Sequence, residues 1–210
     1  MFTIQNVWYL KDLFFEKNKG TVLEFPNFLN DDEINFIINK ADNIVEQGEV
    51  YDGDAQGNIT NEEYRNSPVS FLNPDDKEVS HIFRKLTDII LDINAKHYDF
   101  TLQFIEPLQY TKYIGNNSKP GFYGKHTDGS GFKTGFVDRK LSFSILLCDP
   151  NNYEGGDLIA YNGTDTEGYI PKMKKGTIVF FPSALTHEVT PVTKGERISL
   201  VGWISGPEFK

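Results

Sequence analysis

The chain has 210 residues, and its 21 Lys and Arg against 30 Asp and Glu give a formal net charge of -9. This length favours a single domain with a substantial core. The acidic balance argues against duplex DNA or an acidic membrane as the main partner, because neutralising phosphates needs clustered Lys and Arg. A single cysteine, Cys148, excludes an internal disulfide. The sequence has neither a signal-peptide pattern nor a long apolar run, so we expect a soluble, cytoplasmic protein.

Two amphipathic helices are predicted in the N-terminal half. Asn30 precedes an acidic first turn, and apolar residues then recur at helical spacing over 34–45. Asn73 as a cap and Pro74 at the first helical position predict a second helix, whose apolar stripe covers 79–93. The polar segment 47–66 between them is predicted as a long loop, which is either a lid over a binding site or a solvated connection.

The C-terminal half is predicted to be all-β. Short strand-like runs separated by Gly, Asn and Pro cover 102–105, 108–114, 141–147, 157–161, 177–181 and 197–204. The runs 141–147 and 197–204 alternate clearly, with apolar residues on one face and a mixed set on the other. In the last run the mixed face holds Arg197, Ser199, Val201 and Trp203. This pattern predicts a sheet whose apolar face packs on the helices and whose mixed face lines a cavity.

Arg197 is the charged residue on that mixed face. Burying an arginine beside Val201 and Trp203 is costly unless an anion or a protein carboxylate pairs with it. The alternative is an exposed arginine on a solvent-facing strand, which is the common situation for this residue type. The spacing of the histidines favours the interpretation in which Arg197 faces the cavity.

His126, Asp128 and His187 form a candidate metal triad upstream of this arginine. Residues two apart on a strand share a face, and two imidazoles with one carboxylate suit a divalent iron that keeps positions open for oxygen and a co-substrate. The planar guanidinium of Arg197 is shaped to grip a carboxylate of that co-substrate. A second His-x-Asp, at His97, has no partner at a sensible distance and is interpreted as structural. Zinc remains a chemical alternative for the triad.

These residues sit within a longer resemblance. The region 110–207 resembles the prolyl 4-hydroxylase branch of the iron(II)- and 2-oxoglutarate-dependent dioxygenases, and within it the microbial and phage hydroxylases of the PKHD type. The resemblance is carried by the segments 109–113 (QYTKY), 123–128 (YGKHTD), 139–147 (RKLSFSILL), 153–158 (YEGGDL), 175–183 (KGTIVFFPS) and 187–197 (HEVTPVTKGER), followed by Trp203. A phage-encoded member would work in the host cytoplasm.

The resemblance implies a mainly β protein with N-terminal helices: a double-stranded β-helix, or jelly roll, with cupin-like architecture and helices packed on its major sheet. It implies one dioxygenase domain over 1–210, with helical support and a lid loop in 1–100 and a catalytic core in 101–210. His126, Asp128 and His187 would hold iron(II). Arg197 would bind the distal carboxylate of 2-oxoglutarate, with Tyr113 beside it and Trp203 walling the pocket. A second tyrosine found in relatives is replaced here by Leu146, which leaves more of its role to Tyr113.

The substrate implied by the resemblance is proline in a peptide, hydroxylated with oxygen while 2-oxoglutarate is decarboxylated to succinate, with ascorbate as a candidate reductant. The candidate substrate contacts are Tyr123, Arg139 and Arg65. The segments 47–66, 116–121 and 129–137 would border a closing cleft, with aromatic surfaces from Tyr51, Tyr64, Phe122, Phe132 and Phe136. Alternatives are hydroxylation of a free amino acid or other small molecule, a nucleic-acid demethylase, and a non-enzymatic jelly-roll binding protein.

Overall fold

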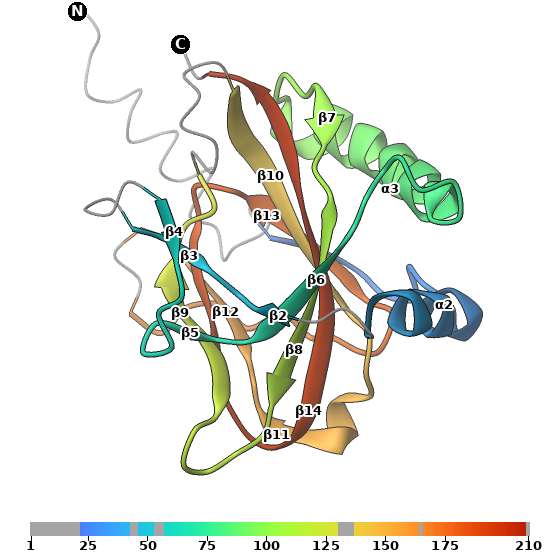
Figure 1. Ribbon diagram of the computed structural model, residues 1–210. Helices are drawn as coiled ribbons and strands as arrows, with labels where there is room; N and C mark the ends of the chain where they lie inside the picture. Colours follow the sequence, from blue (N-terminus) through green and yellow to red (C-terminus); the bar gives the residue numbers. More distant parts are fainter. Residues whose placement is uncertain (1–21, 43–45, 53–56, 130–136, 164–165, 209–210) are drawn as a thin grey trace, which may run out of the picture.

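A computed structural model of the protein describes residues 22–42, 46–52, 57–129, 137–163 and 166–208. Two layers of strands face each other, and two helices cover the outer side of one layer (Figure 1). The N-terminal half supplies the two helices, a π-helical turn and several short strands, which are β1 (Leu23–Phe25), α2 (Asp31–Ala41), β2 (Glu46–Gln47), β3 (Val50–Asp52), β4 (Gly57–Ile59), β5 (Arg65–Asn66), β6 (Pro68–Leu72), α3 (Ser80–Ile93) and η2 (Asn94–Tyr98).

The larger sheet has the order β1-β13-β10-β14-β8-β6-β2, and the short β7 pairs with the end of β14. Neighbouring strands in it are antiparallel. Its C-terminal members are β7 (Phe104–Ile105), β8 (Leu108–Ile114), β10 (Val137–Leu146), β13 (Ile178–Pro182) and β14 (Thr186–Pro207). The smaller sheet forms around the first half of β14, from β5 together with β9 (Gly121–His126), β11 (Tyr153–Gly155) and β12 (Leu158–Tyr161), the 3₁₀ turn η3 (Pro150–Asn152) leading into β11.

The strand β14 belongs to both sheets. Its residues up to Gly195 pair with β9, β11 and β12, whereas its residues from Glu196 onward pair with β8 and β10. Gly195 has φ 74°, and a Cβ atom there would lie 2.0 Å from the carbonyl oxygen of Asn152. Only glycine fits this corner, where the chain passes from the smaller to the larger sheet. His187 and Arg197 therefore lie on one strand but in two different sheets.

The helices cover the outer face of the larger sheet, as predicted. One continuous apolar core joins α2 and α3 to this face, and its buried side chains include Ile37 and Leu86 from the helices and Phe143, Phe180 and Leu200 from the strands. The start of α2 is fixed by a capping box, in which Asn30 accepts from the Glu33 amide and Glu33 accepts from the Asn30 amide. The predicted jelly roll with helices on its major sheet is confirmed.

Several predicted boundaries are wrong. The helix α2 ends at Ala41 rather than 45, and residues 43–45 lie outside the described residues. The helix α3 begins at Ser80, because Asn73 and Pro74 open a turn closed by the Asp76 amide on the Asn73 carbonyl (3.1 Å). The predicted loop 47–66 contains the paired strands β3 and β4, and also β5, which pairs with β9. The predicted strand 102–105 shrinks to β7.

The strands β9 and β11 and the first half of β14 were not predicted as strands. They are interrupted by register shifts against one another, which break the alternation that reveals a strand in sequence. Among the described residues, no helix has both the length and the apolar character needed to cross a bilayer.

Candidate metal centre and co-substrate pocket

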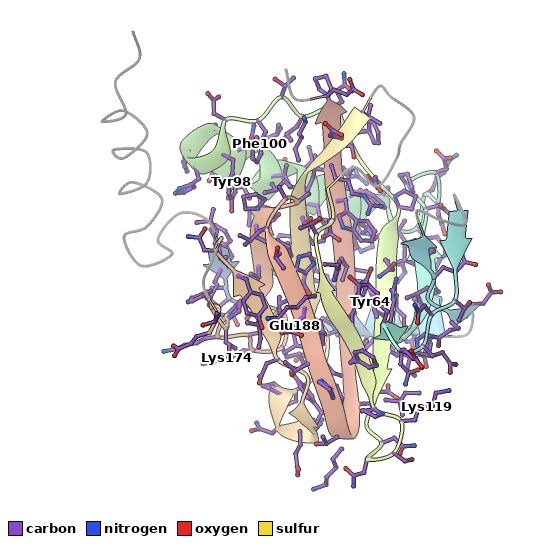
Figure 2. The ribbon with its side chains drawn as sticks, turned by 90° about the vertical axis from the view of Figure 1, so that its left-hand side faces the viewer. Tyr64, Tyr98, Phe100, Lys119, Lys174 and Glu188 are labelled. Carbon is purple, nitrogen blue, oxygen red and sulfur yellow. The ribbon has the colours of Figure 1, made fainter. Side chains whose placement is uncertain are left out.

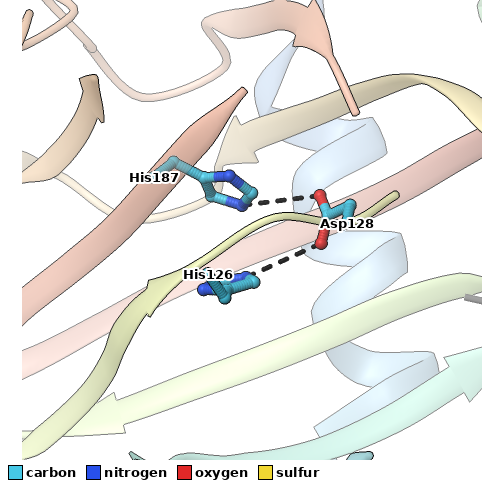
Figure 3. Close-up of side chains that lie close together, drawn as sticks. All are labelled: His126, Asp128 and His187. Carbon is cyan, nitrogen blue, oxygen red and sulfur yellow. Dashed lines mark ion pairs between the residues drawn. The ribbon is translucent and has the colours of Figure 1, made fainter. Parts of the chain in front are cut away.

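The three predicted metal ligands meet between the two sheets. His126 ends β9, Asp128 follows it, and His187 on β14 is the direct register partner of His126. The Asp128 carboxylate lies between the imidazoles, with Oδ1 3.6 Å from His126 Nε2 and Oδ2 3.4 Å from His187 Nε2 (Figure 3). The potential ligand atoms all lie within 4.8 Å of one another. No other His, Cys, Asp and Glu cluster of this kind occurs in the described part of the chain.

The backbone fixes the orientation of both imidazoles. His126 Nδ1 lies 2.8 Å from the Gly124 carbonyl oxygen, and His187 Nδ1 lies 2.9 Å from that of Leu185. A carbonyl can only accept, so each Nδ1 carries a proton and Nε2 is the ring nitrogen that can bind a metal. Such outer hydrogen bonds commonly orient histidines that bind metals. Both Nε2 atoms are therefore ready to act as ligands on the side where Asp128 lies.

The electrostatics of the triad suit a cation. Burial and the neighbouring His187 lower the pKa of His126 to about 4, so this imidazole is neutral at physiological pH. Burial alone would raise the pKa of the Asp128 carboxyl, but the two imidazoles, with Arg139 and Trp203, hold it below its usual range. Asp128 Oδ2 is buried without a hydrogen-bond partner. A buried carboxylate oxygen without a hydrogen bond, beside two imidazole lone pairs, fits a divalent metal.

A cavity opens beside the triad between the two sheets. Its wall combines polar and apolar groups from both sheets. It is lined by Gln109, Tyr113, Tyr123, His126, Asp128, Ser144, Leu158, Phe181, His187, Val189, Ser199, Val201 and Trp203.

Arg197 is almost fully buried, with 1% of its surface exposed, and it packs against Tyr113 and Ser199, which line the cavity, without lining the cavity itself. Its Nη1 donates to the Ser199 hydroxyl (3.3 Å), and its Cζ lies 5.2 Å from the centre of the Tyr113 ring. Gly156 leaves room for its stem, since a Cβ atom there would lie 2.9 Å from Arg197 Cδ. Arg197 takes part in no ion pair within the described residues, and its Nε has no hydrogen-bond partner. The burial of Arg197 agrees with the predicted inward face of β14, and its pairing with an anion stays a prediction.

Comparison with known proteins identifies the family. The profile of the 2OG-Fe(II) oxygenase superfamily matches residues 108–205. A PKHD-type hydroxylase from Prochlorococcus marinus (strain MIT 9312) is 30% identical over 169 residues, which cover 80% of this chain and 69% of that protein. This chain belongs to the 2OG-Fe(II) oxygenase superfamily.

Two further similar proteins match different shares of this chain. A PKHD-type hydroxylase from another strain of Prochlorococcus marinus is 42% identical over 91 residues, which cover 43% of this chain and only 39% of that protein. A solved prolyl hydroxylase from Trichoplax adhaerens, in complex with a hypoxia inducible factor oxygen degradation domain peptide fragment, superposes with a TM-score of 0.68 at 14% identity. That superposition covers 97% of this chain and 94% of the other. At this low identity it demonstrates the shared fold.

The remaining predicted site residues of this superfamily member surround the triad. Tyr123 stacks on His126 with ring centres 3.7 Å apart, and the Arg65 guanidinium lies 4.6 Å from the centre of the Tyr123 ring. Arg65 is buried, donating to the Ser67 hydroxyl and the Glu49 carbonyl, and does not line the cavity. The structure thus places Arg65 behind Tyr123. Direct contact of Tyr123, Arg139 or Arg65 with substrate stays a prediction.

The second His-x-Asp plays no part in the site. His97 is exposed in η2, and Asp99 after it has φ 54°. Of the aromatic residues predicted near a cleft, Tyr64 lies beside β9 (Figure 2). Its hydroxyl donates to the Lys125 carbonyl (2.5 Å). The segment 130–136, with Phe132 and Phe136, lies outside the described residues, as does the side chain of Tyr51.

Sequence reasoning did not single out Gln109 and Ser144, which line the pocket, or the buried carboxylate of Glu106, which does not. Gln109 shares the cavity-facing side of β8 with Tyr113, so strand alternation could have found it. Ser144 occupies the mixed face of β10 in the same way. Glu106 gave no signal, since the partner of its buried carboxylate, Arg139, is distant in sequence.

Proposed function

We propose that the protein is an iron(II)- and 2-oxoglutarate-dependent dioxygenase that hydroxylates prolyl residues in a peptide or protein. In the overall reaction a substrate C–H bond becomes C–OH, and 2-oxoglutarate and oxygen yield succinate and carbon dioxide. The observation that carries the proposal is the buried Arg197 guanidinium, which has no carboxylate partner among the described residues and contacts Tyr113 and Ser199 in the wall of the cavity that holds the triad. A cation and a metal-ligand triad at one cavity fit a small dianion that also reaches the metal.

Different residues of the site would bind the metal, bind 2-oxoglutarate and exclude water. His126, Asp128 and His187 would hold iron(II), which when bound would supply the activation of oxygen. Arg197 would pair with the distal carboxylate of 2-oxoglutarate. Burial raises the pKa of the Tyr113 hydroxyl, which therefore stays protonated and can donate to the same carboxylate. The apolar smaller-sheet side chains in the lining would keep water from the reacting groups.

A row of side chains leads from this cavity to the surface. Ser144, Val201, Gln109 and Phe71 are successive register partners across β10, β14, β8 and β6, so all four point to the same side of the larger sheet. The first three line the cavity, while Phe71 at the end of the row is 51% exposed. An exposed aromatic ring continuous with the cavity wall suits the apolar ring of a peptidyl proline.

We expect Phe71→Ala to raise the KM for a peptide substrate about fivefold, because it removes roughly 1 kcal/mol of apolar contact. The KM for 2-oxoglutarate should stay unchanged, since Phe71 lies at the outer end of the row. Leu91→Ala is the matched control, because Leu91 is 60% exposed on α3, where no residue lines the cavity. Equal peptide KM values for the two variants would contradict a substrate surface at Phe71.

The decisive experiment is an assay of succinate formation with a library of proline-containing peptides, followed by mass spectrometry. With iron(II) and 2-oxoglutarate, we expect succinate and a peptide heavier by one oxygen atom, and neither product when alanine replaces proline. Parallel reactions without ascorbate test whether this reductant sustains turnover.

Three controls separate the alternatives. Free proline and a methylated oligonucleotide replace the peptide in parallel reactions, and a product from either one alone would reassign the substrate. Zinc in place of iron(II) should support no turnover. Absence of both succinate and tight iron(II) binding would overturn the enzyme assignment.

A further inference from the structure

Glu106 is a buried carboxylate beside the site that the proposed chemistry does not use. It lies between β7 and β8 with 3% of its surface exposed. Arg139 Nε lies 3.0 Å from both carboxylate oxygens, and Arg139 Nη2 lies 2.7 Å from Oε2. The Ser205 hydroxyl donates to Oε1 (2.7 Å). A forked, charge-assisted contact of this kind holds a guanidinium plane in one orientation.

The same guanidinium lies against the ring of Trp203. Arg139 Cζ is 3.9 Å from the centre of the indole ring, within the range of a strong cation–π contact. The Glu106 amide also donates to the Trp203 carbonyl oxygen (2.9 Å). A register shift in the pairing of β10 with β14 follows Arg139, and such irregularities redirect side chains. Glu106 and Arg139 therefore hold both the backbone and the ring of Trp203.

Trp203 in turn lies beside the metal ligand Asp128. Both line the same cavity, and Trp203 is 8% exposed. Its indole Nε1 is buried without a hydrogen-bond partner, and so is Asp128 Oδ2. A buried N–H and a buried carboxylate oxygen on one cavity wall are complementary, because each alone carries a desolvation penalty.

We propose that Glu106 and Arg139 are positioning residues that hold the Trp203 indole N–H toward Asp128 and so set the orientation of this metal ligand. The proposal rests on the proposed metal site. It gives Arg139 a role in metal binding rather than in direct substrate contact. The indole donor restricts rotation of the carboxylate, so that Asp128 presents an oxygen to the point faced by both imidazole Nε2 atoms. Outer partners of metal ligands commonly contribute about 10- to 100-fold to metal affinity.

The test uses Mn(II) as the metal probe and Trp203 as a fluorescent reporter. Trp8 is the only other tryptophan in the sequence, so the Trp8→Phe chain reports on Trp203 alone. In this background we compare Glu106→Gln, Arg139→Gln and the double variant. Calorimetry gives the Mn(II) dissociation constant, and acrylamide quenching of the apo protein gives the exposure of the indole.

We expect each single variant to weaken Mn(II) binding about tenfold and to increase quenching of Trp203. The double variant should be no worse than the weaker-binding single variant, because the two residues act as one unit. Arg139→Lys keeps the charge but loses the planar fork, so it should recover only part of the affinity. The control Glu154→Gln breaks the exposed ion pair with Lys194 (2.9 Å) and should change neither readout.

The outcomes separate this inference from the proposed function. If the parent chain binds no Mn(II), the metal site itself is wrong. If the parent binds Mn(II) and Glu106→Gln binds it equally with unchanged quenching, the positioning role is wrong. A rise in the peptide KM for Arg139→Gln at unchanged Mn(II) affinity would show that Arg139 contacts the substrate and does not position Trp203. Should Glu106→Gln fail to fold, Arg139→Lys and Ser205→Ala, which leaves the ion pair in place, give the same readouts.

Discussion

Asp128→Ala is expected to abolish succinate formation and to weaken Mn(II) or iron(II) binding by more than about 100-fold. Loss of an outer hydrogen-bond partner alone typically lowers metal affinity about 10- to 100-fold, and Asp128 is the only anionic member of the triad. Its removal leaves two imidazoles, which bring no negative charge and so attract a divalent cation far less strongly. Calorimetric titration with Mn(II) and a succinate assay on the same preparation measure both effects.

His97→Ala provides the matched control for this prediction. It removes the histidine of the other His-x-Asp in the chain, which is exposed in η2 and does not line the cavity. This variant should bind Mn(II) and turn over like the parent protein. Undiminished metal binding by Asp128→Ala, or an equal loss in both variants, would show that the triad does not hold the metal.

The grouping of the candidate site residues could be predicted in part because it depends on local relations. The two-residue spacing keeps His126 and Asp128 close along the chain, although Asp128 lies just past the end of β9. Strand alternation places Arg197 on the same face of β14 as Val201 and Trp203. The structure adds why His187 joins them. The long strand β14 begins in the smaller sheet opposite His126 and turns into the larger sheet at Gly195. The periodicity of residues along the chain does not show that β14 pairs with strands of one sheet before Gly195 and with strands of the other sheet after it.

Residues that act through long-range partners escaped prediction. Glu106 acquires its role only because β7 and β10 both flank the end of β14, which brings Arg139 and Ser205 to its carboxylate. Phe71 joins the row that starts in the cavity only through the pairing of β6 with β8. Neither pairing leaves a trace in the spacing of residues along the chain.

The start of α3 was misplaced for a different reason. Asn followed by Pro marks the first two positions of a β-turn as well as a helix start, and the turn prevails here. Lys40 on α2 forms an ion pair with Asp76 (2.7 Å) and another with Glu78, so the turn is held against the neighbouring helix. The local sequence is compatible with both structures, so it does not choose between them, and the ion pairs with α2 accompany the turn.

Arg197→Met is expected to raise the KM for 2-oxoglutarate about 100-fold, with a much smaller change in the peptide KM. The substitution removes two charge-assisted hydrogen bonds to the distal carboxylate, together about 3 kcal/mol. Methionine keeps most of the stem volume, so the core around Gly156 and Tyr113 stays filled. Arg197→Lys keeps a cation but not the planar fork, and its KM should rise only about tenfold. Initial rates at varied 2-oxoglutarate concentrations measure these effects.

The thermal stability of the Arg197 variants provides an independent check. Replacing a buried residue usually lowers the melting temperature, whereas here we expect no decrease. In the protein without ligand, Arg197 is a buried charge with no ion-pair partner among the described residues, so replacing it by methionine should leave the melting temperature equal or raise it. The parent protein should gain stability when 2-oxoglutarate is added with Mn(II), as any ligand that binds only the folded state requires. Arg197→Met should lose most of that gain. A large loss of stability in the ligand-free variant would instead mean that Arg197 is a structural residue, and its burial would no longer argue for an anionic co-substrate.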